Sequence, residues 1–294
     1  MAAGKPILRR LIKEKGTVWA AGAFDALSAR MINDAGFDAL LTSGFGISSS
    51  FLGQPDAELY TMTENLTVVR NVINTVDIPV IADIDTAYGN AINVMRTVRE
   101  FEIAGAAAVI MEDQVAPKRC PASSNMIDII SIEEAVAKVE AAVGARSNPE
   151  MLVIARTDAV SEDEAIRRAV AYVKAGADII QPISKCFKSI AGLRKLRAAC
   201  GVPLSLQLLG WLERDLSRAE IEEVAGIATF PLVPLMSAAH AMRENLKVLA
   251  RDKSSKALPL AVMDHNAFSV FIGFPKIEEL QNKYLRFLPS RAAE

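Results

Sequence analysis

The stretch IPVIADIDTAYGNAINVMRTVREFEIAGAAAVIMEDQ, residues 78–114, places two short apolar runs on either side of one amphipathic pattern. Runs as apolar as IPVIADID and AVIMEDQ are typical of strands that are buried on both faces of a sheet. The segment between them, NVMRTVREFEIAGA, is long enough to form a crossover helix, which makes the two flanking strands parallel. This stretch therefore predicts a parallel α/β fold.

The same unit recurs along the chain, and eight strand-helix units can be counted in the 294 residues. Eight units favour a single closed (β/α)8 TIM barrel domain over residues 1–294. The alternative is a doubly wound open sheet, but no Gly-rich dinucleotide fingerprint follows the first predicted strand. Three predicted helices end in an Ala-Gly step, at Gly36, Gly105 and Gly176, as expected where glycine stops a helix. Residues 252–294 are too apolar for a solvated terminus and should pack against another surface.

The charge balance points to a small metabolite as the partner. The chain has 33 Lys and Arg against 35 Asp and Glu, a formal net charge of -2, so nucleic acid or an anionic membrane is not an expected partner. No apolar run approaches membrane-spanning length, and the basic N-terminus reads as a leading helix, with a cleaved targeting peptide as the alternative. Three widely spaced cysteines and two histidines argue against disulfides and zinc, and a reducing cytoplasm is expected.

Polar residues close several of the predicted strands, at the end of a TIM barrel where active sites are built. They are Thr42, Ser43 and Gly44 after the second strand, Asp83 and Asp85 after the third, Glu112 and Asp113 after the fourth, and Arg156 and Asp158 after the fifth. Asp83 and Asp85 stand at i and i+2, which predicts that both lie on one face of a strand. Four acids converging on one barrel end indicate a hard-cation site for Mg²⁺. The alternative is that individual acids cap helices or pair with Arg156.

Arg156 and the Ser43–Gly44 step are candidates for anion binding. The guanidinium is a planar fork suited to a substrate carboxylate, and the backbone N–H groups near Gly44 could approach an anion. Arg156 could equally be a structural ion-pair partner.

The loop VAPKRCPASSN, residues 115–125, follows the fourth strand and is predicted to lie over the barrel opening as a lid. Lys118 and Arg119 directly precede Cys120 and would lower the pKa of its thiol, which could then give or take a proton near neutral pH. The alternative is an ordinary surface cysteine. Cys186 and Cys200 have no comparable surroundings and are predicted to be unreactive.

These residues resemble the isocitrate lyase and phosphoenolpyruvate mutase superfamily over almost the whole chain. The matching pieces are AGAFDALSARMINDAGFDALLTSG at 21–44, LGQPD at 52–56, VIADIDTAYGN at 80–90, MEDQVAPKRC at 111–120, VIARTDA at 153–159 and AGADII at 175–180. The resemblance implies a barrel that uses Mg²⁺, or alternatively Mn²⁺, to hold a 2-oxo acid or its enolate. It also implies that the C-terminal helices are exchanged between subunits of a homo-oligomer, expected to be a tetramer built as a dimer of dimers.

The resemblance also implies residue roles. The metal residues would be Asp83, Asp85 and Glu112; the substrate-binding residues would be Ser43, Gly44, Phe45, Asp56, Asp85, Arg156 and Gln207; and the catalytic residues would be Lys118, Arg119, Cys120 and Arg156. In the lyase branch, the cysteine of a KRCGH loop is the acid that protonates the departing carbanion, and Lys118, Arg119 and Cys120 match its first part.

Several positions depart from the lyase pattern. Pro121 and Ala122 replace the Gly-His that follows the lyase cysteine, and about Ile183 stands where the lyases have an acid on the sixth strand. A glutamate with paired glycines is missing around QLLGWLERD, residues 207–215, and Leu41 stands near the place of a tyrosine. ISK, residues 183–185, is similar to the HSK piece of the phosphonate branch. The residues expected to bind the metal match the lyase pattern, whereas several residues expected near the substrate differ from it.

Three hypotheses follow. The first is an Mg²⁺-dependent carbon-carbon lyase of the 2-methylisocitrate lyase type, acting on a small 2-hydroxy or 2-oxo dicarboxylate whose far end is more apolar than that of a tricarboxylate. The second is a carboxyphosphonoenolpyruvate or phosphoenolpyruvate phosphonomutase-like enzyme, or an oxaloacetate decarboxylase. The third is a barrel that binds a metabolite without converting it.

Overall fold

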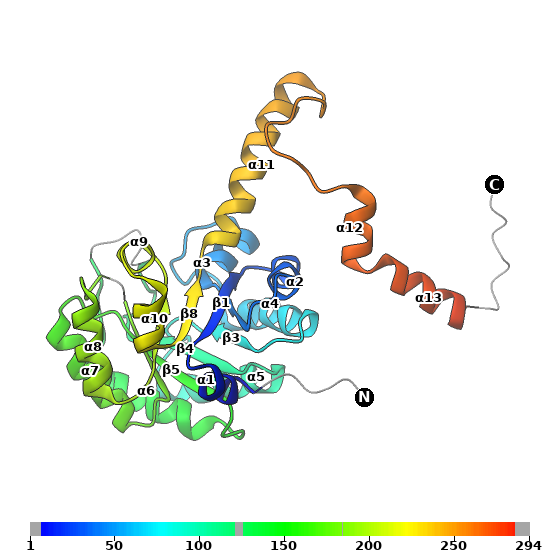
Figure 1. The fold of residues 1–294 in the computed structure, drawn as a ribbon. Coiled ribbons are helices and arrows are strands. Elements are labelled where there is room, and N and C mark those ends of the chain that lie inside the picture. The colour runs from blue at the N-terminus through cyan, green and yellow to red at the C-terminus, as the bar shows by residue number, and fades with distance from the viewer. Residues whose placement is uncertain (1–6, 121–125, 184, 286–294) are drawn as a thin grey trace, which may run out of the picture. The chain divides into compact units, whose positions relative to one another are not determined.

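The computed structural model describes residues 7–120, 126–183 and 185–285, and its strands form one closed parallel barrel (Figure 1). The strands are β1 (Val18–Ala23), β2 (Ala39–Thr42), β3 (Val80–Asp83), β4 (Ala108–Glu112), β5 (Leu152–Thr157), β6 (Ile179–Pro182), β7 (Leu204–Gln207) and β8 (Ala225–Phe230). Each strand pairs with the next, and β8 pairs with β1 to close the ring. The predicted TIM barrel is therefore confirmed, and the open-sheet alternative is wrong.

Helices alternate with these strands, as the sequence pattern predicts. They are α1 (Leu8–Lys15), α2 (Ala26–Asp34), α3 (Gly44–Ile47), the π-helical turn η1 (Ser48–Leu52), α4 (Met62–Thr75), α5 (Ala91–Ala104), α6 (Ile132–Ala145), α7 (Glu162–Lys174), α8 (Ile190–Cys200), α9 (Trp211–Arg214), α10 (Arg218–Val224), α11 (Val233–Asp252), α12 (His265–Ile272) and α13 (Phe274–Tyr284). Gly36, Gly105 and Gly176 follow α2, α5 and α7 with φ of 82°, 98° and 101°, which confirms the predicted glycine stops.

Two apolar layers hold the barrel together. Alternate strand residues point inward and form a cluster that includes Ile81, Ile110, Ile154 and Ile227, each no more than 2% exposed. Leu8 of α1 joins this cluster and is 1% exposed, so the leading helix is part of the core. The residues between them point outward and pack against the ring of helices. The barrel interior is therefore filled by side chains.

Contacts within the chain divide it into two compact units, Met1–Ser237 and Ala238–Glu294. In the second unit, the side chain of Asn245 donates to Leu260 O (3.0 Å) and accepts from Leu260 N (3.1 Å), which ties α11 to the segment after it. Apolar side chains are exposed along α12 and α13, among them Val270, Phe274 and Ile277. The single-domain assignment, the use of residues 252–294 in oligomerisation and the exchange of these helices between subunits stay predictions.

No helix in the described part of the chain is both long enough and apolar enough to span a membrane.

Candidate active site

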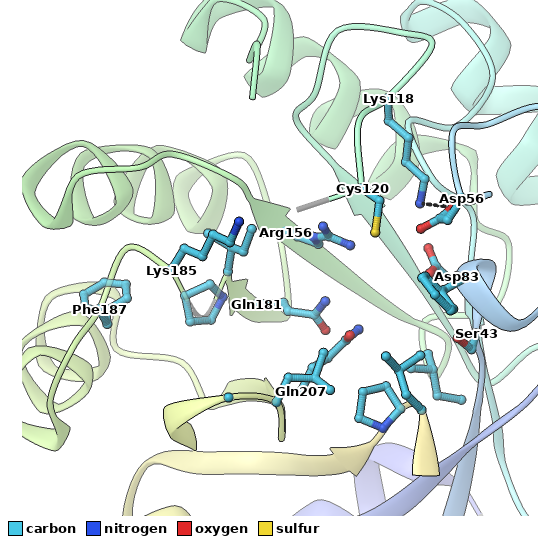
Figure 2. Close-up of a pocket in the computed structure, with 18 of the residues that line it drawn as sticks. Ser43, Asp56, Asp83, Lys118, Cys120, Arg156, Gln181, Lys185, Phe187 and Gln207 are labelled. Atoms are coloured by element: carbon cyan, nitrogen blue, oxygen red, sulfur yellow. Dashed lines mark ion pairs between the residues drawn. The ribbon is translucent and has the colours of Figure 1, made fainter. Parts of the chain in front are cut away.

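A cavity of about 570 Å³ opens where the strands of the barrel end (Figure 2). It is lined by Leu41, Ser43, Phe45, Asp56, Asp83, Lys118, Cys120, Arg156, Gln181, Pro182, Ile183, Lys185, Phe187, Lys188, Gln207, Leu209, Gly210, Trp211, Pro231 and Leu232. Every lining residue belongs to the first compact unit. The size is typical of sites for small organic molecules.

The cavity has two chemically different sides. Figure 2 shows Asp56, Asp83, Lys118, Cys120 and Arg156 on one side, and Lys185 and Phe187 across from them. We call the first the charged side; it comprises the lining residues that follow β2 to β5 together with Asp85 and Glu112 directly behind them. The side chains of Gln181 and Gln207 lie between the two. The charged side is therefore the part of the cavity that carries groups able to bind charge or transfer a proton.

Asp83 and Asp85 lie close together, but the backbone that brings them together differs from the prediction. Asp83 is the last residue of β3, but Asp85 lies beyond the strand in a left-handed conformation with φ of 50°. The expectation that both acids share one face of a strand is therefore wrong. The turn nevertheless brings them together, since Asp85 N donates to Asp83 Oδ1 (3.2 Å).

Gly44 lies against both carboxylates. A Cβ atom there would come within 3.0 Å of Asp83 Oδ2 and of Asp85 Oδ1, so any side chain would displace an acid. Gly44 N donates to Asp83 Oδ2 (3.2 Å), and Ser43 Oγ accepts from Gly46 N (3.2 Å). The predicted anion-binding N–H of Gly44 is thus used to orient Asp83, while Ser43 and Phe45 line the cavity as predicted.

Lys118 reaches into the middle of the acids. Its ammonium lies 2.5 Å from Asp85 Oδ1, 3.0 Å from Asp56 Oδ1 and 3.9 Å from Glu112 Oε1, and the side chain is 2% exposed. Burial alone would lower the pKa of Lys118, but these carboxylates raise it well above its usual value, so the amine is charged. Its backbone N–H is held by Glu58 Oε2 (3.1 Å).

Arg156 is held between two acids. Its NH1 lies 2.7 Å from Glu112 Oε2, and its Nε and NH2 donate to Asp158 Oδ1 at 3.2 and 2.9 Å. Gln114 Nε2 donates to the other oxygen of Asp158 (3.2 Å). The predicted role as an ion-pair partner is confirmed. Arg156 also lines the cavity, and its binding of a substrate carboxylate stays a prediction.

Asp113 points away from the cavity, contrary to the expectation that four acids converge. Its carboxylate accepts from Thr157 Oγ1 (2.8 Å), Tyr172 OH (2.6 Å) and Arg168 NH1 (3.1 Å) behind the barrel wall. These donors satisfy the acid, and its role is structural. The neighbouring Glu112 faces the opposite way because successive side chains of a strand alternate.

The remaining acids are suited to a divalent cation. Burial first, and then the Asp85 charge, raise the pKa of Asp83 to about 6, and burial raises that of Glu112 well above its usual value. Lys118 and Arg156 lie within ion-pair distance of Asp56 Oδ1, Asp85 Oδ1 and Glu112 Oε2, but neither these oxygens nor Glu112 Oε1 accept a well-oriented hydrogen bond. A cation would satisfy such oxygens.

The acids do not form a closed cage. Within residues 7–120, 126–183 and 185–285, no three His, Cys, Asp or Glu side chains gather into a metal site made of protein ligands alone. Mg²⁺ usually keeps several waters and takes only one or two carboxylates, so the donor set fits Mg²⁺ in that mode.

The three residues of the KRC piece point in different directions. Cys120 is half-buried and lines the cavity beside Lys118. Arg119 is not among the lining residues; its NH2 lies 3.4 Å from Asp128 Oδ2, and both side chains are exposed to solvent. Pro121 and Ala122, and with them much of the predicted lid, lie outside the described residues. Of the predicted catalytic residues, Lys118, Cys120 and Arg156 are brought together and Arg119 is not.

The opposite side of the cavity was largely missed by the sequence analysis. Gln207 lines the cavity as predicted and Ile183 was noted as a departure from the lyase pattern, but Gln181 and the apolar residues after β7 and β8 were not singled out. Ser205 Oγ donates to Gln181 Oε1 (2.9 Å), which turns the amide N–H groups of Gln181 to other partners. The signal was available, because Gln181 is the polar residue that closes the apolar run of β6.

A family model described as phosphoenolpyruvate phosphomutase matches residues 8–250. The chain belongs to this family. It is 38% identical over 287 residues to the 2,3-dimethylmalate lyase of Eubacterium barkeri, which covers 94% of this chain and 96% of that protein. This family member superposes with a TM-score of 0.88 and 33% identity on the phosphoenolpyruvate phosphomutase of Streptomyces platensis subsp. rosaceus, covering 97% and 100% of the two chains.

A phosphonopyruvate hydrolase solved in complex with oxalate and Mg²⁺ gives a TM-score of 0.84 at 32% identity, with 95% of this chain and 98% of that chain covered. The superfamily predicted from the sequence motifs is therefore confirmed. The protein is an enzyme of a superfamily whose named members include lyases, mutases and hydrolases of small organic acids.

Proposed function

We propose that this enzyme cleaves a carbon-carbon bond in a 2-hydroxy dicarboxylate and releases a 2-oxo acid and a second acid. The observation that carries the proposal is the charged side of the cavity. It gathers acids suited to a cation, a guanidinium next to the open space and a thiol on the same wall. Full-length similarity to a 2,3-dimethylmalate lyase supports the same reaction class.

Residues of this chain would bind the substrate and protonate the carbon that departs. A carboxylate of the substrate would lie at Arg156, whose fork presents N–H donors on a rigid plane. The substrate hydroxyl gives its proton to a carboxylate of the acid cluster, and the hydroxyl-bearing carbon becomes the carbonyl of the oxo acid. The electron pair of the broken bond goes to the carbon next to the second carboxylate, and the Cys120 thiol protonates that carbon. The protonated carboxylate then releases its proton to solvent and the thiolate takes one from solvent, which restores both groups.

A divalent cation, Mg²⁺ by preference, would be held by one or two of Asp83, Asp85 and Glu112 with water completing its shell, and it would supply Lewis-acid polarisation of the oxo-acid oxygens. Lys118 would balance the remaining negative charge of the acids, since its ammonium lies within 4 Å of three of them. The tetrameric state and the cytoplasmic location stay predictions.

The second candidate is phosphonate chemistry or oxaloacetate decarboxylation. The observation in its favour is the similarity to a phosphonopyruvate hydrolase, with a TM-score of 0.84, and to a phosphomutase, with a TM-score of 0.88. The charged side would bind those substrates as well, but neither reaction gives the Cys120 thiol a carbanion that leaves as a second acid.

The test is proton and phosphorus NMR of the Mg²⁺-loaded protein with 2,3-dimethylmalate, 2-methylisocitrate, oxaloacetate, phosphonopyruvate and phosphoenolpyruvate. Each incubation is repeated with Cys120→Ser and with Cys200→Ser as the matched control, because Cys200 ends α8 and does not line the cavity. Pyruvate plus a second acid, lost in Cys120→Ser alone, is the expected result. A new phosphorus signal indifferent to Cys120 would favour the second candidate, and silence across the panel would favour a barrel that only binds.

A further inference from the structure

The half of the cavity across from the acids is apolar. We call it the apolar lobe and define it by Ile183, Phe187, Leu209, Trp211, Pro231 and Leu232, which come from the segments after β6, β7 and β8. Phe187 is 1% exposed and Ile183 is 8% exposed, so these walls are firmly packed. Such a surface gains free energy by covering apolar groups of a ligand.

The lobe is unsuited to a third carboxylate. A carboxylate placed against buried apolar walls would lose its hydration without gaining a partner. Lys185 and Lys188 also line the cavity, but both are exposed, so their charges lie in water where ion pairs contribute little. Gln181 and Gln207, between the charged side and the lobe, are neutral and can bind one carboxylate without requiring a second charge.

The volume also exceeds what a small acid needs. A cavity of about 570 Å³ lies in the range that encloses drug-sized ligands. The oxo-acid fragment of the substrate would be fixed at Arg156 and the acids. The fragment that leaves as the second acid is then the part that extends past the two glutamines into the apolar lobe.

We propose, building on the carbon-carbon lyase function above, that the substrate carries an extended alkyl or aryl substituent on the carbon that leaves as the second acid, and that the apolar lobe binds this substituent. The preferred substrates are malates with a substituent longer than methyl. The products are a short oxo acid and a longer-chain or aryl-bearing carboxylic acid.

The first experiment measures kcat/KM for pyruvate release from 2,3-dimethylmalate and from its 3-propyl and 3-benzyl homologues. Burying one methylene contributes about 0.8 kcal/mol, a factor of about four, so the propyl homologue should exceed the methyl compound about fifteenfold. Pyruvate is the shared product, so one assay serves the series. A kcat/KM that falls from methyl to propyl to benzyl would overturn the inference and leave the lyase function standing.

The variant Leu209→Gln places an amide in the lobe at similar volume and should reduce the ratio of kcat/KM for the propyl compound to that for the methyl compound to about twofold. Leu216→Gln is the matched control, because Leu216 is half-buried against the core and does not line the cavity. Equal chain-length preference in both variants would contradict the assignment of the lobe.

Binding separates this inference from the proposed function. Alkylsuccinates lack the hydroxyl and cannot be cleaved, so their calorimetric affinities report on the lobe alone. Affinity that rises about fourfold per methylene supports the lobe even if no malate is cleaved. Affinity that is flat along the series would overturn the inference whatever the reaction is.

Discussion

The two sides of the cavity are built on the same eight-stranded frame but in different ways. The segments after β2 to β5 carry charged groups that hold one another in place, such as Lys118 among the acids and Arg156 between Glu112 and Asp158. The strands and segments from β6 to β8 contribute the neutral amides of Gln181 and Gln207, apolar side chains, and two exposed lysines, Lys185 and Lys188. This difference indicates that the residues for the reaction and the residues that select the substrate lie on separate arcs of the barrel. Changes in the first arc should affect every substrate, and changes in the second should affect some more than others.

The largest effect is expected for Asp85→Asn. Asparagine tolerates the left-handed conformation at this position, so the turn should keep its shape while the charge is lost. Because a preorganised electrostatic group at the reacting centre contributes on the order of 10³ in rate, kcat should fall by about that factor for all substrates. Mg²⁺ affinity, followed by the shift in Tm, should weaken in parallel.

Asp128→Asn is the control, since Asp128 pairs with Arg119 in an exposed position. A loss in Asp85→Asn that is confined to one substrate would contradict the separation of the two arcs.

Cys120→Ser should give the next largest effect. A serine hydroxyl is a far weaker acid than a thiol, and a positioned acid contributes roughly 10²–10⁴ in rate, so kcat should fall by at least about 10². Cys186 is not an alternative donor, because it is buried and does not line the cavity, and burial raises the pKa of its thiol to about 12. Stopped assays of pyruvate check the prediction, and full activity in Cys120→Ser would remove the thiol from the mechanism.

Gln181→Glu probes the boundary between the two sides. The carboxylate would still accept from Ser205 but would lose the N–H donors and repel a substrate carboxylate, so KM should rise about tenfold or more with kcat less affected. Ser205→Ala tests whether the effect comes only from disturbing the amide. A fall in kcat equal for all substrates, with KM unchanged, would place Gln181 among the chemical groups instead.

The smallest effect is expected for Gln114→Met. Gln114 Oε1 accepts from Arg119 N (2.9 Å) and its Nε2 donates to Asp158, so it joins the segment bearing Cys120 to the partner of Arg156. Gln114 does not touch the reacting atoms, so removing these hydrogen bonds should cost about 1 kcal/mol of positioning in the transition state and lower kcat about fivefold. An unchanged pH profile together with lower kcat would indicate a positioning role, whereas a shifted profile would contradict it.

The barrel could be predicted from the sequence because its buried parallel strands are continuous apolar runs and several of its helices begin at Ser, Thr, Asn or Asp caps or end at glycine. Polar residues at the ends of such runs also predicted Asp83, Glu112 and Arg156 at the cavity or directly behind it. The error about Asp85 came from extending the strand by two residues, and a left-handed turn achieves the same proximity.

The direction of a side chain next to a strand end was harder to predict. Asp113 and Arg119 look as suitable in sequence as Glu112 and Lys118, but their partners are distant in the chain or on the solvent side, and only packing decides between them. The sequence analysis expected a more apolar end of the substrate site, but it did not identify most of the residues that form the apolar lobe, for a similar reason. Leu209, Trp211 and Leu232 resemble ordinary core residues until the fold leaves them facing open space.

The most direct test of the account is cleavage of 2,3-dimethylmalate in D₂O, followed by proton NMR, with Mg²⁺ and after its removal by EDTA. The account predicts equal amounts of pyruvate and of propionate with one deuterium next to the carboxylate, because a proton donor delivers exchangeable hydrogen to the departing carbon. Both products should disappear with EDTA and fall at least about 10² in Cys120→Ser. The absence of pyruvate from this and the longer homologues, in samples where oxaloacetate or phosphonopyruvate is consumed, would contradict it.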